Sequence, residues 1–141
     1  MKVVILLLVG CFFGIIACES APAGPIPTPT PITVEIFESA GNIIDLYESN
    51  EVAAEAKYTG RWADIDGAVG EIESKGSRIE VNLAPIGEMF VFSTIVCKIS
   101  EEDTQSVVNL RKDDIITVRG KIKGVPGVSN VVVEPCVVLG S

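Results

Sequence analysis

Pairs of carboxylates are the first feature of this chain that could do chemistry. Asp64 and Asp66 lie two residues apart, and Glu71 and Glu73 repeat that spacing. Such pairs can hold Ca²⁺ or divide the roles of acid and base between them. The chain has no histidine, which removes the commonest general base and the commonest zinc ligand. We therefore predict no catalytic residue and no cofactor, with a metal site at Asp64 and Asp66 or a carboxylate-dependent enzyme as alternatives.

Aromatic and basic side chains form a second candidate set. Trp62, Phe90, Phe92, Arg119 and Lys121 could bind a ligand, because single-stranded nucleic acids bind basic grooves with stacking aromatics. We expect Phe90 and Phe92 to share one face of a strand, as stacking residues would. From residue 18 onward, however, ten lysines and arginines stand against nineteen aspartates and glutamates, a net charge of −9. This acidity disfavours phosphate backbones, which need clustered cations.

The amino terminus has the pattern of an export signal. One positive residue, Lys2, precedes the apolar run Val3 to Ala17, which is shorter than the roughly 20 residues of a membrane-spanning helix. The run ends in Ile15-Ile16-Ala17-Cys18, which resembles the bacterial lipobox. That resemblance implies cleavage before Cys18 and acylation of this cysteine, with palmitate-type chains anchoring it to a membrane. An ordinary cleaved signal and a retained membrane helix are the alternatives.

Three parts of the chain follow from this pattern. Residues 1–17 are predicted to be the cleaved signal peptide, and residues 18–32 the lipid-anchored cysteine with its tether. The tether contains the proline-rich sequence ESAPAGPIPTPTP, which favours extended polyproline geometry over helix or sheet. Residues 33–141 are predicted to form one folded domain outside the cytoplasm.

Two helices are predicted at the start of the folded domain. From Thr33 onward the apolar residues follow a helical period, and one face would carry Phe37, Ala40, Ile44 and Tyr47. Asn50 is a suitable N-cap for a second, shorter helix over Glu51 to Lys57.

After Gly60 the apolar residues alternate as in strands. Five strands are predicted, over Arg61–Glu73, Arg78–Leu83, Met89–Ile99, Asp114–Lys123 and Asn130–Leu139. The alternation slips near Gly67 and Gly70, which indicates a β-bulge or a bend. A helix beginning at Ser100 would separate the third strand from the fourth. This order predicts a mainly β (α+β) five-stranded OB-fold barrel, with a helix between strands 3 and 4 and an N-terminal helical segment.

Dispersed residues between about Ile43 and Leu139 carry a resemblance to a known family. They are Tyr47-Glu48-Ser49-Asn50, Ala54, Lys57-Tyr58-Thr59-Gly60, Gly67-Ala68-Val69, Cys97, Asp114 to Gly120 and Cys136. In these positions the chain resembles the tRNA-anti-like family, a group of largely uncharacterised exported or lipid-anchored bacterial OB-fold proteins. The resemblance implies an OB fold and no particular activity.

An OB barrel brings two further sets of residues together. Its third and fifth strands are neighbours, so Cys97 and Cys136 could form a disulfide, which an exported domain permits; two buried free thiols are the alternative. The first and fourth strands are also neighbours. Charge pairing with Arg119, Lys121 and Lys123 would therefore account for the two carboxylate pairs without a metal.

These expectations combine into a functional hypothesis. The chain is predicted to be a lipid-anchored, non-catalytic binding module for an envelope protein, peptide, glycan or small ligand. Recognition would use a barrel face or the loop from Leu83 to Glu88. A nucleic-acid-binding OB-fold protein is the alternative, followed by the carboxylate-dependent enzyme. The oligomeric state is left open.

Overall fold

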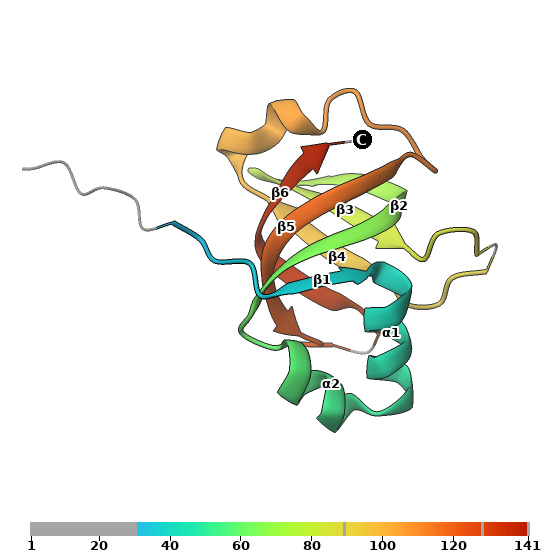
Figure 1. Cartoon of the computed structure of the whole chain (residues 1–141). Coiled ribbons are helices and arrows are strands. Elements are labelled where there is room, and N and C mark those ends of the chain that lie inside the picture. Colours follow the sequence, from blue (N-terminus) through green and yellow to red (C-terminus); the bar gives the residue numbers. More distant parts are fainter. Residues whose placement is uncertain (1–30, 89, 128, 141) are drawn as a thin grey trace, which may run out of the picture. The chain divides into compact units, whose positions relative to one another are not determined.

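The computed structural model describes residues 31–88, 90–127 and 129–140 (Figure 1). The predicted signal peptide, Cys18 and the tether up to residue 30 lie outside the described residues. Within the described ranges, no helix is both long enough and apolar enough to cross a membrane.

The described part consists of six strands, two α-helices and one 3₁₀-helix. In chain order they are β1 (Ile36–Ser39), α1 (Ala40–Ser49), α2 (Glu51–Tyr58), β2 (Trp62–Lys75), β3 (Arg78–Ala84), β4 (Ile95–Ile99), η1 (Glu101–Ser106), β5 (Ile115–Gly124) and β6 (Val131–Gly140).

Five of these strands close into a barrel. The order around it is β2, β3, β4, β6 and β5, and pairing of β2 with β5 closes the ring. All neighbours are antiparallel except β4 and β6, which are parallel. The short strand β1 lies outside the ring and pairs in parallel with residues 63–66 of β2. The five-stranded barrel predicted from the sequence is therefore confirmed, and β1 is an addition to it.

The first helix begins later than predicted. Ser39 has extended backbone angles, and its hydroxyl accepts a hydrogen bond from the Asn42 amide at 3.2 Å, so the helix starts at Ala40. Ala40, Ile44 and Tyr47 are buried as predicted, whereas Phe37 lies in β1 and is 73 % exposed. The placement of Phe37 on the helix face was wrong, because the N-cap at Ser39 separates it from the helix.

The second helix matches its prediction. The side chain of Asn50 accepts a hydrogen bond from the Ala53 amide at 3.1 Å, and α2 runs from Glu51 to Tyr58. In Figure 1, α1 and α2 lie together at one end of the barrel and η1 lies at the other end.

The strand predicted over Met89–Ile99 is much shorter in the structure. Only Ile95–Ile99 pairs with neighbouring strands. Phe90 and Phe92 lie in the preceding loop and are 80 % and 91 % exposed, so their predicted place on a strand face was wrong. The strand begins where Asn130, next to β6, accepts hydrogen bonds from the amide and hydroxyl of Thr94.

The helix predicted from Ser100 is a short 3₁₀-helix. It spans Glu101–Ser106, so Val107 and Val108 follow it instead of lying on it. Val107 is buried and Val108 is exposed. Its first turn is acidic, with Glu101, Glu102 and Asp103.

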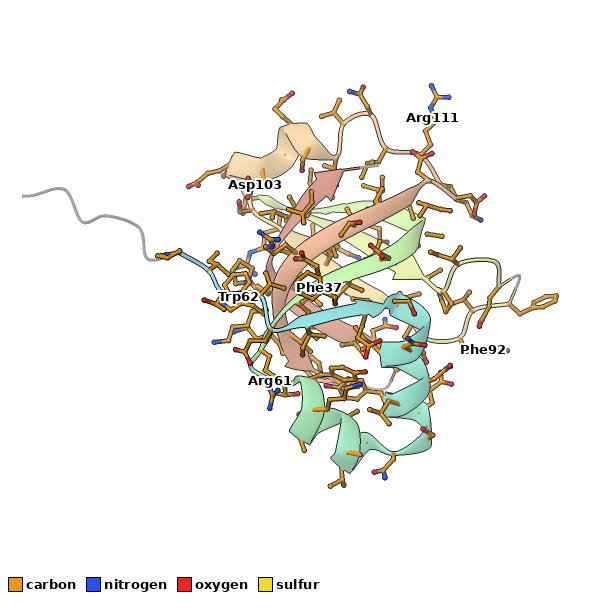
Figure 2. All side chains as sticks on the ribbon, viewed as in Figure 1. Phe37, Arg61, Trp62, Phe92, Asp103 and Arg111 are labelled. Atoms are coloured by element: carbon orange, nitrogen blue, oxygen red, sulfur yellow. A yellow bond between two sulfur atoms is a disulfide. The ribbon has the colours of Figure 1, made fainter. Side chains whose placement is uncertain are left out.

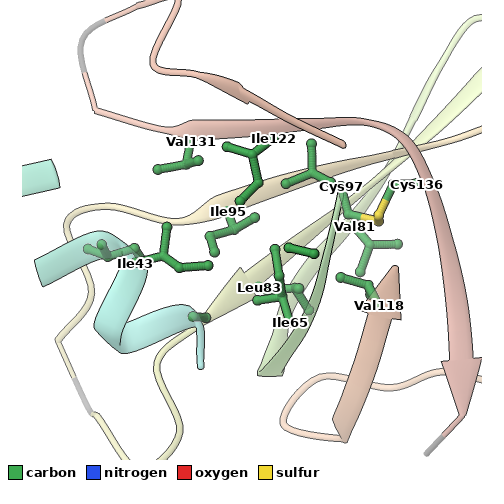
Figure 3. Packing of buried hydrophobic residues seen from close by; sticks show 14 of the residues in the cluster. Ile43, Ile65, Val81, Leu83, Ile95, Cys97, Val118, Ile122, Val131 and Cys136 are labelled. Atoms are coloured by element: carbon green, nitrogen blue, oxygen red, sulfur yellow. A yellow bond between two sulfur atoms is a disulfide. The ribbon is translucent and has the colours of Figure 1, made fainter. Parts of the chain in front are cut away.

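A single apolar core fills the barrel (Figure 3). Alternate residues of each strand point inward, as on β5, where Ile116, Val118 and Ile122 are each no more than 1 % exposed. Cys97 of β4 and Cys136 of β6 form a disulfide inside this core, with Cα atoms 5.5 Å apart. The predicted bridge is confirmed, and both cysteines are shielded from solvent.

Gly120 lies at a close approach between β5 and β6. A β-carbon at this position would lie 2.6 Å from the carbonyl oxygen of Pro135 and would collide with the side chain of Val133. The register between the two strands shifts here, because Gly120 pairs with Cys136 and Ile122 with Val133. Only glycine therefore fits this position without moving β6.

Candidate functional site

Three of the predicted ligand-binding residues come together on one outer face of the barrel. Trp62 pairs with Lys121 across β2 and β5, and Asp64 pairs with Arg119 two residues further along. On the other side of β2, Phe37 of β1 pairs with Asp64. We call Phe37, Trp62, Asp64, Arg119 and Lys121 the Trp62 face. Figure 2 shows Phe37, Arg61 and Trp62 near one another on the same side of the barrel.

Asp64 is held by Arg119 at the centre of this face. The guanidinium donates two hydrogen bonds to the carboxylate, Nε to Oδ1 at 2.7 Å and Nη2 to Oδ2 at 2.8 Å. The hydrogen bond to Asp64 raises the pKa of Arg119 above its usual value. Paired N–H···O bonds of this kind fix both side chains. The predicted charge pairing is therefore confirmed for Asp64.

The alternative of a metal site at Asp64 and Asp66 finds no support in this geometry. Both carboxylates already have partners, because Asp66 accepts a hydrogen bond from the Thr117 hydroxyl at 2.6 Å. Within the described ranges, no group of three or more His, Cys, Asp or Glu residues is arranged to hold a metal ion.

The second carboxylate pair does not meet the basic strand. The register of β2 shifts between Val69 and Glu71, and beyond this bulge the strand pairs with β3 instead of β5. Glu71 and Glu73 therefore lie opposite Asn82 and Glu80, and Glu73 is 2.9 Å from Lys75 of its own strand. The predicted bulge is confirmed, whereas the pairing of Glu71 and Glu73 with β5 was wrong.

Phe90 and Phe92 are not part of the Trp62 face. Both belong to the loop between β3 and β4, and Figure 2 shows Phe92 on the opposite side of the barrel from Trp62. The five predicted ligand-binding residues thus divide between two surfaces. Each surface has aromatic side chains, but only the Trp62 face combines them with cations on neighbouring strands.

The outer face of β3 and β4 differs from the Trp62 face in its side chains. OB folds often bind oligonucleotides and oligosaccharides on the surface of these two strands. Here Arg78 lies 2.9 Å and Lys98 3.7 Å from the same carboxylate, Glu134 of β6. The register of β3 and β4 also places Glu80 beside Lys98. This described surface carries ion pairs and no aromatic side chain, so it offers no platform on which bases could stack.

A large open cavity lies where the bulge of β2 meets the loop after β3. Its volume is ≈ 820 Å³, within the range typical of ligand pockets. Its apolar lining residues are Ala68, Val69, Gly70, Ala84, Pro85, Ile86, Gly87, Val91 and Ile115, and its polar ones are Glu71, Asn82, Glu88, Thr94, Lys112 and Asp113. We call it the loop cavity. It includes most of the loop that the sequence singled out as a recognition segment.

Local backbone geometry explains why the cavity forms there. At the bulge, the amide of Val69 donates to the carbonyl of Asp114 at 2.8 Å, and the amide of Asp113 donates back to Val69 at 2.7 Å. These bonds hold the start of β5 against β2. Past the bulge β2 no longer pairs with β5, and the loop after Ala84 turns away through Gly87, which has a φ of 84°. The space between these segments is the loop cavity.

Apolar side chains remain exposed around this cavity. Ile86 and Ile115 line it and are 49 % and 58 % exposed, and Phe90 and Phe92 extend from the same loop. Exposed apolar clusters of this kind commonly mark interaction sites. Sequence reasoning missed Ile115 in this role, because strand alternation identifies which residues face outward but not which loop lies beside them.

A polar cluster connects α2 to β1 near the Trp62 face. The ammonium of Lys57 donates to Glu38 and to the hydroxyl of Tyr58, both at 2.9 Å. The hydrogen bond from Lys57, with a second from Asn42, holds the pKa of the Glu38 carboxyl below its usual value. The contacts with Tyr58 and Glu38 raise the pKa of Lys57. The cluster therefore contains charges that stabilise one another.

The closed five-stranded barrel, with its helical element between β4 and β5, is an OB fold. The tRNA_anti-like family model matches residues 2–137, and the chain belongs to this family. None of the curated proteins matches the chain at a significant level.

Several solved structures of other proteins are similar to this chain. One is a lipoprotein of Klebsiella pneumoniae subsp. pneumoniae MGH 78578 that carries the provisional name nucleic acid-binding lipoprotein. It is 13% identical, with a TM-score of 0.63 over 75% of this chain and 92% of its own. An aspartyl-tRNA synthetase of Leishmania major, also provisionally named, is 11% identical, with a TM-score of 0.46 over 86% of this chain and 23% of its own. The Stn1–Ten1 complex of S. pombe is 12% identical, with a TM-score of 0.41 over 55% of this chain and 57% of its own.

Proposed function

We propose that the chain is a lipid-anchored binding module outside the cytoplasm, which binds an apolar segment of an envelope protein in the loop cavity. The observation that carries this proposal is the loop cavity itself, bordered by exposed apolar side chains on one loop. A few well-packed anchor residues, often aromatic, contribute most of the binding energy in protein interfaces. A partner side chain that enters the cavity would remove Ile86 and Ile115 from water.

Three observations support the location outside the cytoplasm. The lipobox-like sequence that ends in Cys18 supports acylation of this cysteine. The Cys97–Cys136 disulfide fits an oxidising compartment, because cytosolic thiols are normally kept reduced. The Klebsiella pneumoniae protein with the same fold is also named a lipoprotein.

The polar residues around the cavity suit recognition better than catalysis. Glu71, Glu88 and Asp113 are exposed at its edge, beside Lys112. Exposed charges at the border of an apolar patch commonly form the rim of a protein interface. Their role in the proposal is to select a partner segment with complementary charge, whereas the apolar walls supply the affinity.

Site-specific photo-crosslinking in the native envelope tests the binding role. A photoreactive amino acid at position 86 is expected to capture a defined partner, and the same group at position 52 is the control. Val52 is 81 % exposed on α2, away from the cavity lining. Phe92→Ser is expected to reduce capture at position 86 severalfold. Equal capture at both positions, or capture that Phe92→Ser leaves unchanged, would refute the loop cavity as the binding site.

Labelling with a radioactive fatty acid tests the anchor separately. The wild-type protein is expected to incorporate the label and to sediment with membranes, and Cys18→Ala is expected to lose both properties. A Cys18→Ala protein that still carried the labelled lipid would overturn the assignment of Cys18 as the anchor.

A further inference from the structure

Basic side chains continue beyond the Trp62 face, along β5 and at the start of β2. Lys121 and Lys123 follow Arg119 along the outer side of β5, and Arg61 directly precedes β2. Neither Lys121 nor Lys123 forms an ion pair with another described residue. Arg119 is committed to Asp64, so these two lysines are the cations left available to a ligand.

Several acidic side chains near these lysines already bind other residues. Glu38 is bound to Lys57, and Glu35 lies 3.9 Å from Arg61. On α2, Glu55 lies next to Gly124 at the end of β5 and accepts a hydrogen bond from the hydroxyl of Thr59. At physiological salt, charges more than about 8 Å away are largely screened, so the charges at this face and beside it decide which ligands it attracts.

Two aromatic side chains lie beside these cations. Phe37 is 73 % exposed on the edge strand β1, and Trp62 is partly exposed on β2 directly opposite Lys121. Tryptophan and phenylalanine beside lysine are the residue types that favour the boundary between lipid headgroups and acyl chains. An exposed aromatic side chain on an edge strand is also a liability in water.

The tether joins the domain at this same face. The amide of Glu35, just before β1, donates a hydrogen bond to the carbonyl of Trp62 at 3.0 Å. From Cys18 to Glu35 the chain advances 17 residues, which can span at most about 60 Å when fully extended. A chain anchored at Cys18 therefore holds the Trp62 face within reach of the bilayer surface.

We propose that the Trp62 face is a second membrane contact, which rests on anionic lipid headgroups of the bilayer that holds the Cys18 anchor. This inference relies on the proposed lipid anchoring for its high local lipid concentration. Lys121 and Lys123 lie near lipid phosphates, and Trp62 and Phe37 enter the headgroup region. The exposed loop that carries Phe92 is on the other side of the barrel and stays open to a partner (Figure 2).

Trp62 itself reports on the contact, because it is the sole tryptophan of the chain. The test uses the polypeptide from residue 18 onward with Cys18→Ser, so that no lipid anchor contributes. Vesicles of phosphatidylglycerol and phosphatidylcholine are expected to shift its emission to shorter wavelength, and bromine-labelled lipids are expected to quench it. Pure phosphatidylcholine vesicles are expected to do neither.

Matched charge variants locate the contact. Lys121→Gln/Lys123→Gln is expected to weaken vesicle binding by about 25-fold, since each lysine near an anionic surface contributes about fivefold. Lys75→Gln/Arg111→Gln makes the same change in net charge on other surfaces, and it is expected to change binding less than twofold. Unfolding in urea verifies that both double variants are folded.

Three results would overturn the proposal. The first is unchanged Trp62 emission at millimolar concentrations of anionic lipid. The second is an equal loss of binding in the two double variants, which would show a net-charge effect only. The third is quenching of Trp62 by a single-stranded oligonucleotide at phosphate concentrations too low for vesicle binding, which would assign the face to nucleic acid. The fatty-acid labelling of Cys18 is a separate measurement, so failure of the anchor and failure of this contact are distinguishable.

Discussion

Removal of the disulfide should cost the domain a large part of its stability. The bridge joins Cys97 and Cys136 across the parallel pair β4 and β6 and closes a loop with a sequence separation of 39 residues. For a loop of this length, the restriction of the unfolded chain contributes about 4 kcal/mol. Domains of this size have free energies of unfolding of about 5–15 kcal/mol. We therefore expect Cys97→Ala/Cys136→Ala to fold, but with a much lower urea midpoint.

Urea titrations followed by far-UV circular dichroism and by tryptophan emission measure this loss. The reduced wild-type protein is the matched control, since it keeps both sulfur atoms in the core and lacks only the covalent bond. We expect it to lose about 4 kcal/mol, and the double alanine variant to lose more because two small cavities are added. The denaturant slope should rise, because the unfolded chain without a bridge exposes more surface.

A free energy of unfolding that falls by less than about 1 kcal/mol on reduction would refute this stabilisation by the bridge. Mass spectrometry would show that no bridge is present if two thiols of the non-reduced protein, unfolded without reductant, were alkylated. Under native conditions reduction should be slow, because Cys97 and Cys136 are 0% and 1% exposed and the bond becomes accessible only on opening. Rapid reduction in the absence of denaturant would contradict the burial of the bridge.

Two further predictions concern packing and pH. Gly120→Ala should lower the free energy of unfolding in urea by about 3 kcal/mol, because its methyl group has no room between β5 and β6, whereas Gly127→Ala, with nothing within 4 Å, should be nearly neutral. An unaltered urea midpoint for Gly120→Ala would disprove the close approach. The pKa of Glu38 is lowered in the fold, mainly by Lys57, so its contribution to stability is present above its unfolded pKa and is lost as pH falls through the lower folded pKa. Glu38→Gln should therefore flatten the decline in urea midpoint below about pH 4.5, and an identical acid profile in both proteins would refute this coupling.

The sequence predicted the barrel well where alternation was regular. On β5 the alternation of Ile116, Val118, Gly120 and Ile122 with polar residues is sufficient to place one face in the core, and the structure confirms it. The disulfide followed from the barrel order, because β4 and β6 are neighbours in any OB fold. These predictions depend on the alternation of apolar and polar residues and on the order of the strands and the helix. Both can be identified in a single sequence.

The predictions from the sequence were wrong where contacts with distant parts of the chain determine the local structure. The apolar run before Ile95 looks like a strand, but no neighbouring strand is available to pair with Phe90 or Phe92. Phe37 fitted a helical period by chance, although Ser39 carried an N-cap signal that could have corrected the helix start. A run of apolar residues cannot by itself distinguish a buried strand from an exposed apolar loop. This distinction decides the location of Phe90 and Phe92, which lie in an exposed loop beside the loop cavity and not on a strand face.

The bulge in β2 explains how one strand supports two surfaces of different chemistry. Before the bulge, β2 lies between β1 and β5, so its outward residues Trp62 and Asp64 meet the cations of β5. After the bulge, the same strand pairs with β3, and its outward residues are the acidic Glu71 and Glu73. Without the extra residue, the side chains beyond it would point to the opposite face. The Trp62 face therefore lies beside residue 35, where the tether ends, and the acidic edge of the loop cavity lies farther along the same strand, so the bulge separates the two proposed contact surfaces.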